Sequence, residues 1–203
     1  MRAVVISAGE IKDTDYIKTF IHEGDFIICA DGGLKHAGNL GVTPNLTVGD
    51  FDSWQGEIKG EVIKFNPEKD YTDTHIAVNE ALRRGADEII ILGGSGTRLD
   101  HTVSNIGLLE YIAKRGAKGQ LINETNIITV ITKDTEFEGE KGEYISLIPI
   151  GQVRGVTLEN LKYPLNNATL DFEESLAVSN EFIGKTATVR LKEGSLIVFR
   201  SRD

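Results

Sequence analysis

The first part of the chain alternates short apolar runs with stretches of helical periodicity. The apolar runs are rich in Val and Ile, and in chain order they read AVVISAG, DFIICADGG, LTVGDF, EVIKF and EIIILGG. Continuous runs of this kind are typical of strands covered on both faces, as in parallel sheets. Helices are predicted at residues 74–84 and 102–115, where basic residues precede a closing glycine. The alternation predicts an α/β fold with a mostly parallel sheet.

The helical period disappears after about residue 126, and β-rich runs take its place. These runs are NIITVIT, EYISLIPIG, ATLDF, TATVRL and SLIVFRS, and turn-forming stretches such as EGEKGE and KEGS separate them. Short strands punctuated by turns predict an antiparallel β-sandwich or barrel. We therefore predict a mostly parallel α/β/α sandwich at residues 1–122 and an antiparallel β-sandwich or barrel domain at residues 123–203.

Composition and charge narrow the class of protein. The 203 residues include 31 acidic and 22 basic side chains, so a polyanion such as nucleic acid is not the expected partner. No apolar run approaches the roughly 18 residues that a membrane-spanning helix needs, and we find no signal peptide. The single cysteine, Cys29, excludes an intramolecular disulfide and a thiolate zinc cluster. These features favour a cytoplasmic enzyme or binding protein that has no membrane or nucleic-acid partner.

Aspartates follow the predicted strands at the positions where parallel strands end. They are Asp31, Asp50, Asp52, Asp70, Asp73 and Asp100. The carboxyl ends of parallel strands meet at one edge of the sheet, and ligands bind there. Carboxylates gathered at one edge repel one another unless a cation lies between them. Mg²⁺ typically binds one or two carboxylates together with substrate phosphates, so the sequence predicts magnesium that arrives with a nucleotide.

Glycine pairs and basic side chains in the same turns offer a way to hold phosphate. Gly32-Gly33 and Gly93-Gly94 permit close approach of the backbone to a ligand, and Lys69 and Arg98 supply positive charge. His101 follows in the same region and is placed to touch phosphate. The chain lacks both the P-loop and the Rossmann fingerprints. Phosphate binding is therefore expected to depend on these turns and on helix N-termini.

Helix capping is the plain structural alternative for each aspartate, because aspartate at a strand-to-helix turn is commonly a cap. Asp73 and Asp100 suit that interpretation, since each stands next to a predicted helix. Asp50 and Asp52 suit it less well, because only one residue can occupy a cap position.

Four motifs, in this order, resemble the thiamine pyrophosphokinase family: ADGG, GDFDS, DYTD and GTRLDHT. The resemblance covers the whole chain and includes Ser179-Asn180 in the β half. It implies transfer of the pyrophosphoryl group of ATP to the hydroxyl of thiamine, with thiamine diphosphate and AMP as products. It also implies Mg²⁺ as cofactor and a homodimer in which the β domain binds thiamine near the subunit interface.

The resemblance further implies roles for individual residues. The expected catalytic residues are Asp70, Asp73, Asp100 and Arg98. The expected Mg²⁺ ligands come from Asp50, Asp52, Asp73 and Asp100. The expected contacts with ATP and thiamine come from Asp31, Gly32, Gly33, Ser53, Lys69, Gly94, Thr97, His101, Ser179 and Asn180. Two aspartates stand in two sets because the sequence leaves open which one is the general base and which are ligands.

Three alternative functions stay open at this point. The Asp-x-Asp of LTVGDFDS resembles the start of a phosphatase of the haloacid-dehalogenase type, although its later motifs are not evident. A pyrophosphokinase acting on a pterin alcohol would use the same chemistry on another acceptor. A non-enzymatic sensor of metal and nucleotide would have the β half as an interaction module.

Overall fold

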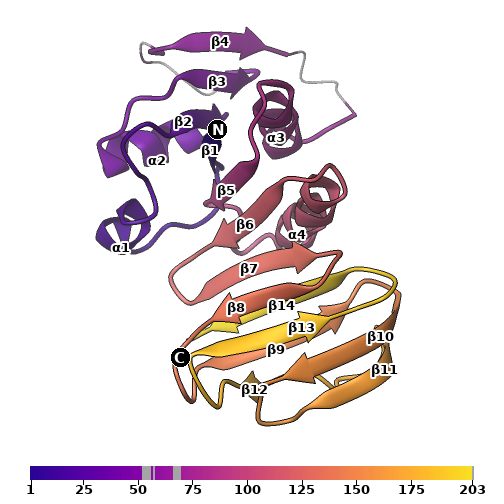
Figure 1. Cartoon of the computed structure of the whole chain (residues 1–203). Helices are drawn as coiled ribbons and strands as arrows, with labels where there is room; N and C mark the ends of the chain where they lie inside the picture. Colours follow the sequence, from indigo (N-terminus) through magenta and orange to yellow (C-terminus); the bar gives the residue numbers. More distant parts are fainter. Residues whose placement is uncertain (52–55, 57, 66–69, 203) are drawn as a thin grey trace. The chain divides into compact units, whose positions relative to one another are not determined.

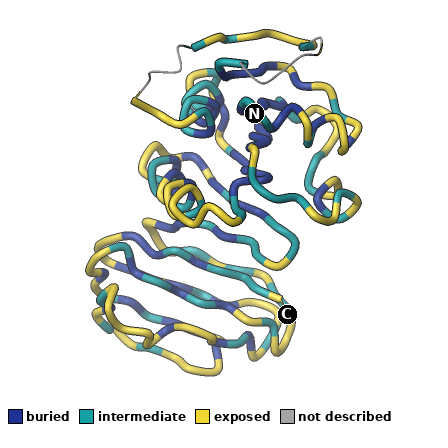
Figure 2. Tube along the Cα trace, turned by 180° about the vertical axis from the view of Figure 1, so that it is seen from behind, coloured by how far each residue is buried: buried dark blue, intermediate teal, exposed yellow. Residues whose placement is uncertain are grey.

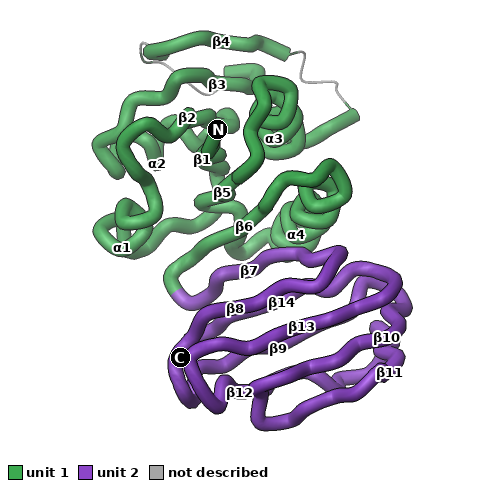
Figure 3. Tube along the Cα trace, in the orientation of Figure 1, with its two compact units in different colours: residues 1–124 green, residues 125–203 purple. Residues whose placement is uncertain are grey.

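The computed structural model describes residues 1–51, 56, 58–65 and 70–202. The chain divides into two compact units, Met1–Glu124 and Thr125–Asp203 (Figure 3). Within the described residues, no helix is both long and apolar enough to cross a membrane.

A parallel sheet forms the centre of the first unit (Figure 1). Its strands are β1 (Arg2–Ile6), β2 (Phe26–Ala30), β3 (Leu46–Gly49), β4 (Glu61–Lys64), β5 (Glu88–Leu92) and β6 (Lys118–Ile122). They lie in the order β6-β5-β1-β2-β3-β4, and every neighbouring pair is parallel. The predicted parallel sheet is therefore confirmed. β6 was not among the predicted strands, because its short KGQLI run has none of the Val/Ile-rich continuity of the other central strands.

The helices of this unit connect the strands and cover the sheet. They are α1 (Thr14–Lys18), α2 (Gly33–Leu40), α3 (Asp73–Arg83) and α4 (Leu99–Ala113). The two longest, α3 and α4, are the two that periodicity predicts, with shifts of one to three residues at their ends. The glycines predicted to close them, Gly85 and Gly116, both have positive φ. α2 and α3 pack against β1 and β2, and α4 packs against β6.

Burial separates the central strands from the edge of the sheet (Figure 2). β1, β2 and β5 are buried at every position but the first, as continuous apolar runs predict. β4 is different, because it has no buried residue and Val62 is 44% exposed. The prediction that EVIKF is covered on both faces is wrong. β4 lies at the end of the strand order, where only β3 pairs with it among the strands described.

The second unit consists of antiparallel strands with a shared apolar core. Its strands are β7 (Asn126–Ile131), β8 (Thr135–Glu138), β9 (Tyr144–Pro149), β10 (Gln152–Glu159), β11 (Leu165–Asp171), β12 (Asn180–Glu181), β13 (Thr186–Arg190) and β14 (Leu196–Ser201). Two layers form, with strand orders β12-β9-β14-β7 and β11-β10-β13-β8. Buried side chains from both layers make one cluster, which includes Leu147, Val156 and Val189. The predicted antiparallel sandwich is confirmed.

Candidate functional site

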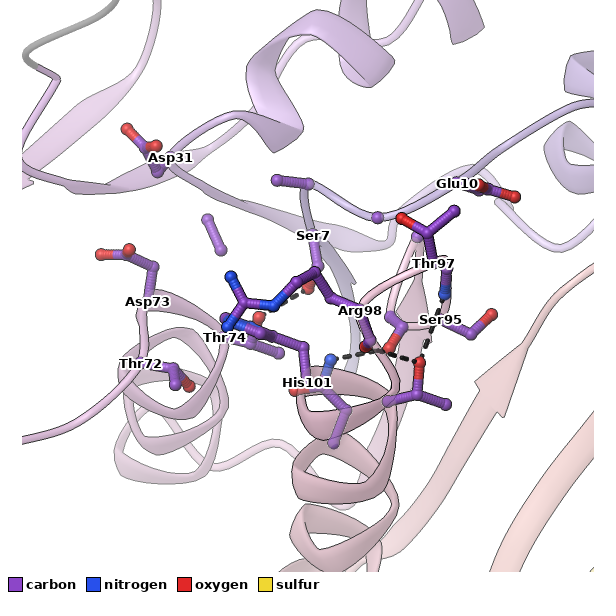
Figure 4. Close-up of a pocket in the computed structure, with 18 residues that line it drawn as sticks. Ser7, Glu10, Asp31, Thr72, Asp73, Thr74, Ser95, Thr97, Arg98 and His101 are labelled. Atoms are coloured by element: carbon purple, nitrogen blue, oxygen red, sulfur yellow. Dashed lines mark hydrogen bonds between the residues drawn. The ribbon is translucent and has the colours of Figure 1, made fainter.

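A cavity of about 500 Å³ lies in the first unit, beyond the carboxyl ends of β1, β2 and β5. β1 has β2 on one side and β5 on the other, and the chain continues outward from both. This is the point where the strand order reverses, which is the usual ligand position in open α/β sheets. The first residues of α3 and α4 also line the cavity (Figure 4). The sheet topology therefore gathers strand ends and helix N-termini around one space.

One side of the cavity is acidic. Asp31 and Asp73 line it and lie on the same side in Figure 4, with Glu10 on the other. Asp31 is positioned by β3, because its backbone N–H donates to the carbonyl of Val48 at 2.8 Å. Burial raises the pKa of the Asp31 carboxyl, and the nearby carboxylates of Asp73 and Asp50 raise it further. The protein thus holds the carboxylates of Asp73 and Asp50 close enough to that of Asp31 to repel it.

The chemistry of this side suits a divalent cation. Within the described residues, no group of three or more His, Cys, Asp and Glu side chains is arranged to hold a metal ion by itself. Mg²⁺ does not need such a cage, because it commonly keeps waters and binds one or two carboxylates plus substrate phosphates. Asp31, Asp50 and Asp73 supply the negative potential that this mode of binding requires. The carboxylates present therefore fit a Mg²⁺ ion that binds together with a phosphate ligand.

An ion pair occupies the start of α4. The guanidinium of Arg98 donates through Nε to Oδ1 of Asp100 at 2.9 Å and through Nη2 to Oδ2 at 2.6 Å. This two-pronged contact with Arg98 holds the pKa of the Asp100 carboxyl well below its usual range. Arg98 lines the cavity, whereas Asp100 lies next to the lining residues. Both side chains are exposed, so a ligand can reach either of them.

The loops after β1 and β5 form the rest of the wall. The backbone N–H of Gly9 donates to the carbonyl of Gly93 at 2.7 Å, and that of Glu10 donates to the carbonyl of Ser95 at 2.8 Å. The contact is so close that a Cβ on Gly9 would collide with the carbonyl oxygens of Gly93 and Ser95. At the end of β1, the hydroxyls of Ser7 and Thr74 are 3.0 Å apart and share a hydrogen bond. The result is a polar surface with many backbone groups.

The SAGE segment, Ser7 to Glu10, lines the cavity directly after the first strand but was not among the predicted site residues. The strand-end rule that indicates the other turns applies equally to this one. Four further lining residues were not predicted either: Thr72, Thr74, Ser95 and Asn105. Asn105 is buried inside α4, where its side chain donates to the carbonyl of Gly94 at 2.7 Å. No local pattern indicates that contact.

The predicted site residues fall into four groups. Those that line the cavity are Asp31, Asp73, Gly94, Thr97, Arg98 and His101. Those of the first unit that lie outside the lining are Gly32, Gly33, Asp50, Asp70 and Asp100. Those outside the described residues are Asp52, Ser53 and Lys69. Those that belong to the second unit are Ser179 and Asn180.

Ser179 and Asn180 have contrasting surroundings. Ser179 is exposed and has φ of 56°, a left-handed conformation that is uncommon for serine. Asn180 is only 1% exposed, and its amide bonds to the backbone of Tyr163 in both directions, at 2.9 and 2.8 Å. The asparagine therefore fixes the turn, and the serine is the one that faces solvent.

Comparisons with known proteins point to one family. A family model described as the thiamin pyrophosphokinase catalytic domain matches residues 17–121, and one described as the vitamin B1 binding domain matches residues 128–196. A thiamine pyrophosphokinase of Bacillus subtilis (strain 168) is 34% identical over the full length of both chains. A Caenorhabditis elegans protein named thiamin pyrophosphokinase 1 is 28% identical over 77% of this chain and 69% of its own.

Solved structures agree with the sequence matches. A crystal structure of thiamine pyrophosphokinase from Bacillus subtilis has a TM-score of 0.90 and 30% identity, with full coverage of both chains. A thiamin pyrophosphokinase structure from Geobacillus thermodenitrificans has a TM-score of 0.88 and 28% identity, and the match covers this chain fully and 98% of the other. Both the fold and the order of the two units are therefore shared.

Proposed function

Because the chain belongs to the thiamine pyrophosphokinase family, and is an ATP-dependent thiamine diphosphokinase, we propose that the cavity of the first unit is where the reaction takes place. The pyrophosphoryl group of ATP passes there to the hydroxyl of thiamine, giving thiamine diphosphate and AMP. One observation carries the proposal: Asp31 and Asp73, with Asp50 close to Asp31, form an acidic side in the same cavity that the cationic Arg98 lines. Transfer of a phosphoryl group needs alignment and neutralised charge more than covalent help, and these residues supply both.

The phosphates of ATP bind the loop that leads into α4. Gly94, Thr97 and Arg98 line this part of the cavity, and His101 follows one residue after Asp100. α4 begins without a side-chain cap, so its N-terminal end favours an anion directly. Gly32 and Gly33 begin α2 directly after Asp31 and are proposed to contact the nucleotide through their backbone. A Cβ on Gly33 would collide with the carbonyl oxygen of Ile6, so this glycine also lets α2 start close against β1. Ser53 and Lys69 complete the proposed contacts from outside the described residues.

Mg²⁺ is the proposed cofactor, with ligands from Asp50, Asp52, Asp73 and Asp100. When bound, the ion neutralises phosphate charge and aligns the phosphates for in-line attack. Arg98 stabilises the charge that develops on the transferred group, because its guanidinium has five N–H donors and the pair with Asp100 uses only two of them. One of Asp70, Asp73 and Asp100 accepts the proton of the thiamine hydroxyl. Asp31 orients the nucleotide at the end of β2.

Thiamine binding and dimer formation are assigned to the second unit. Ser179 is the exposed candidate for a hydrogen bond to thiamine, and Asn180 holds the turn that presents it. Tyr144, Tyr163 and Ile183 are 42%, 54% and 54% exposed on the same unit, which is apolar surface that a second copy of the chain would cover. We therefore propose a homodimer. We also propose that the enzyme acts in the cytoplasm.

The products of the reaction test the function. We expect incubation with ATP, Mg²⁺ and thiamine to give AMP and thiamine diphosphate in equal amounts, measured by chromatography. ADP without AMP would overturn the pyrophosphoryl transfer, and release of free phosphate would indicate a phosphatase. A pterin alcohol in place of thiamine serves as the matched control acceptor, and we expect no product from it. The mass of the protein in solution tests the dimer separately.

A further inference from the structure

Two loops make up one wall of the cavity and behave as one piece. The first loop, residues 7–13, joins β1 to α1, and the second, residues 93–98, joins β5 to α4. Two backbone hydrogen bonds connect them, from Gly9 to Gly93 and from Glu10 to Ser95. Gly9 leaves no room for a side chain between them. A displacement of either loop would therefore move the other.

Both loops are held from outside the cavity by two consecutive side chains. Asn123 follows β6, and its Nδ2 donates to the hydroxyl of Ser95 at 3.0 Å. Glu124 is the next residue, and its Oε1 accepts from the backbone N–H of Lys12 at 2.6 Å and of Asp13 at 3.1 Å. Hydrogen bonds to an ionised carboxylate are stronger than those between neutral groups. One short segment thus anchors the β5–α4 loop through the first residue and the β1–α1 loop through the second.

We propose that Asn123 and Glu124 are positioning residues for the nucleotide, acting through the two loops. The inference rests on the function proposed above. Neither side chain lines the cavity, whereas Ser95 and Glu10, which belong to the anchored loops, do. A catalytic geometry that is loose by about 1 Å can lose roughly 10²-fold in rate, so the side chains that fix a loop matter as much as those that touch the ligand.

These hydrogen bonds end on the two loops, which is what a positioning role requires. Asn123 and Glu124 bond to loop atoms, and β6 is paired with β5 through Lys118–Ile122, which precede both residues. Loss of either side chain should therefore leave the sheet intact and loosen the wall. Because Glu124 acts as an acceptor through Oε1, glutamine can replace it and keep that oxygen.

The experiment compares Glu124→Ala, Glu124→Gln and Asn123→Ala with the parent protein. Affinity for α,β-methylene ATP with Mg²⁺ is measured by calorimetry, since the bond to be broken is replaced in this probe. We expect both alanine variants to bind it about 10-fold more weakly, and the glutamine variant to stay within about threefold. The KM for ATP should rise by the same factor, and the KM for thiamine should not change.

Asn126→Ala is the matched control, because Asn126 also has a side-chain hydrogen-bond network but in β7, where it bonds to Thr125 and Ser201. We expect parental affinity from it. Amide hydrogen exchange should rise at residues 8–13 in Glu124→Ala and at residues 93–98 in Asn123→Ala. If Glu124→Ala does not fold, Glu124→Asp, which keeps the charge but shortens the reach, is expected to show the same loss.

Folded alanine variants with parental affinity for α,β-methylene ATP and unchanged hydrogen exchange would overturn the proposal. The same weakening in Asn126→Ala would also overturn it, since the effect would then not depend on the loops. If the parent protein makes no thiamine diphosphate, the proposed reaction is wrong. The titration with α,β-methylene ATP still decides the positioning role in that case.

Discussion

Asp31 and Asp100 are both aspartates of the first unit at or beside the cavity, yet the charges around them are opposite. Asp31 has Asp73 and Asp50 nearby, and burial together with these charges raises its pKa. Asp100 forms a bidentate ion pair with Arg98, which lowers the pKa of the Asp100 carboxyl. Asp31 directly follows β2 and Asp100 is the second residue of α4, but the residue type is the same, so the difference in pKa comes from the surroundings. An added cation would therefore relieve more repulsion around Asp31 than around Asp100, because the guanidinium of Arg98 already neutralises the carboxylate of Asp100.

The largest expected effect comes from removing a carboxylate on each side. Asp73→Asn and Asp100→Asn should both fold, since neither side chain is buried, and both should lower turnover by at least about 10²-fold. Steady-state kinetics and circular dichroism measure the two properties. A loss of turnover in Asp73→Asn alone would show that the two carboxylates are not equally required, because Asp100 would then serve only to hold Arg98. Near-normal turnover in both variants would show that Asp73 and Asp100 have no part in catalysis and only stabilise the first turns of α3 and α4.

A smaller effect is expected from Arg98→Lys. Lysine keeps the positive charge but loses the planar fork that contacts both oxygens of Asp100. We expect turnover to fall by about 10-fold, with little change in thermal stability because the ion pair is exposed. Rate and melting temperature are measured on the same preparation. A marked loss of stability would contradict the view that the pair is held ready for a ligand.

Asp31→Asn should act on stability in the opposite direction from a usual mutation at a buried site. It removes the repulsion with Asp73 and Asp50, and asparagine accepts the positive φ of 42° at this position. In the presence of a chelator, we expect the melting temperature to rise by about 1–2 °C, a small change because the group is only partly buried. Activity should fall. A lower melting temperature would show that the carboxylate is needed for the fold.

The smallest expected effect is the pH dependence of the difference in melting temperature between Asp31→Asn and the parent protein. Because the pKa of Asp31 is raised in the folded state, its favourable contribution is present below the unfolded pKa of about 3.8 and is lost as pH rises through the folded value. The melting temperatures of Asp31→Asn and the parent should therefore converge near pH 3.8 and separate as pH rises toward 7. The measurement is a series of thermal melts without divalent ions. A gap that is constant with pH would assign the effect to something other than charge.

The sequence predicts the elements whose signal is local and strong. α3 and α4 have clear helical periodicity, and β1, β2 and β5 are continuous apolar runs, so each was found close to its place. The strand-end rule also brings Asp31, Asp73 and Arg98 to one cavity, because parallel strands place their carboxyl ends together. Topology alone carries that part of the site.

The features that were missed depend on contacts between distant segments. EVIKF looks like a central strand, yet its position at the sheet edge leaves it exposed, and composition does not encode position. Asn105 and Glu124 reach the loops from 11 and 111–112 residues away, so no short motif marks them. The electrostatic contrast between Asp31 and Asp100 likewise requires the three-dimensional neighbours.

The contact at Gly9 matters for anyone who reads function from mutational tolerance. A methyl group there would collide with the carbonyl oxygens of Gly93 and Ser95, so every substitution would push the two loops apart. In a saturation screen scored by growth or product, Gly9 would rank with the aspartates proposed to be catalytic, although none of its own atoms would react. Positions that react with the substrate and positions that only lack space for a side chain would both be intolerant of substitution. A screen scored by nucleotide affinity at several temperatures would distinguish the two kinds of position.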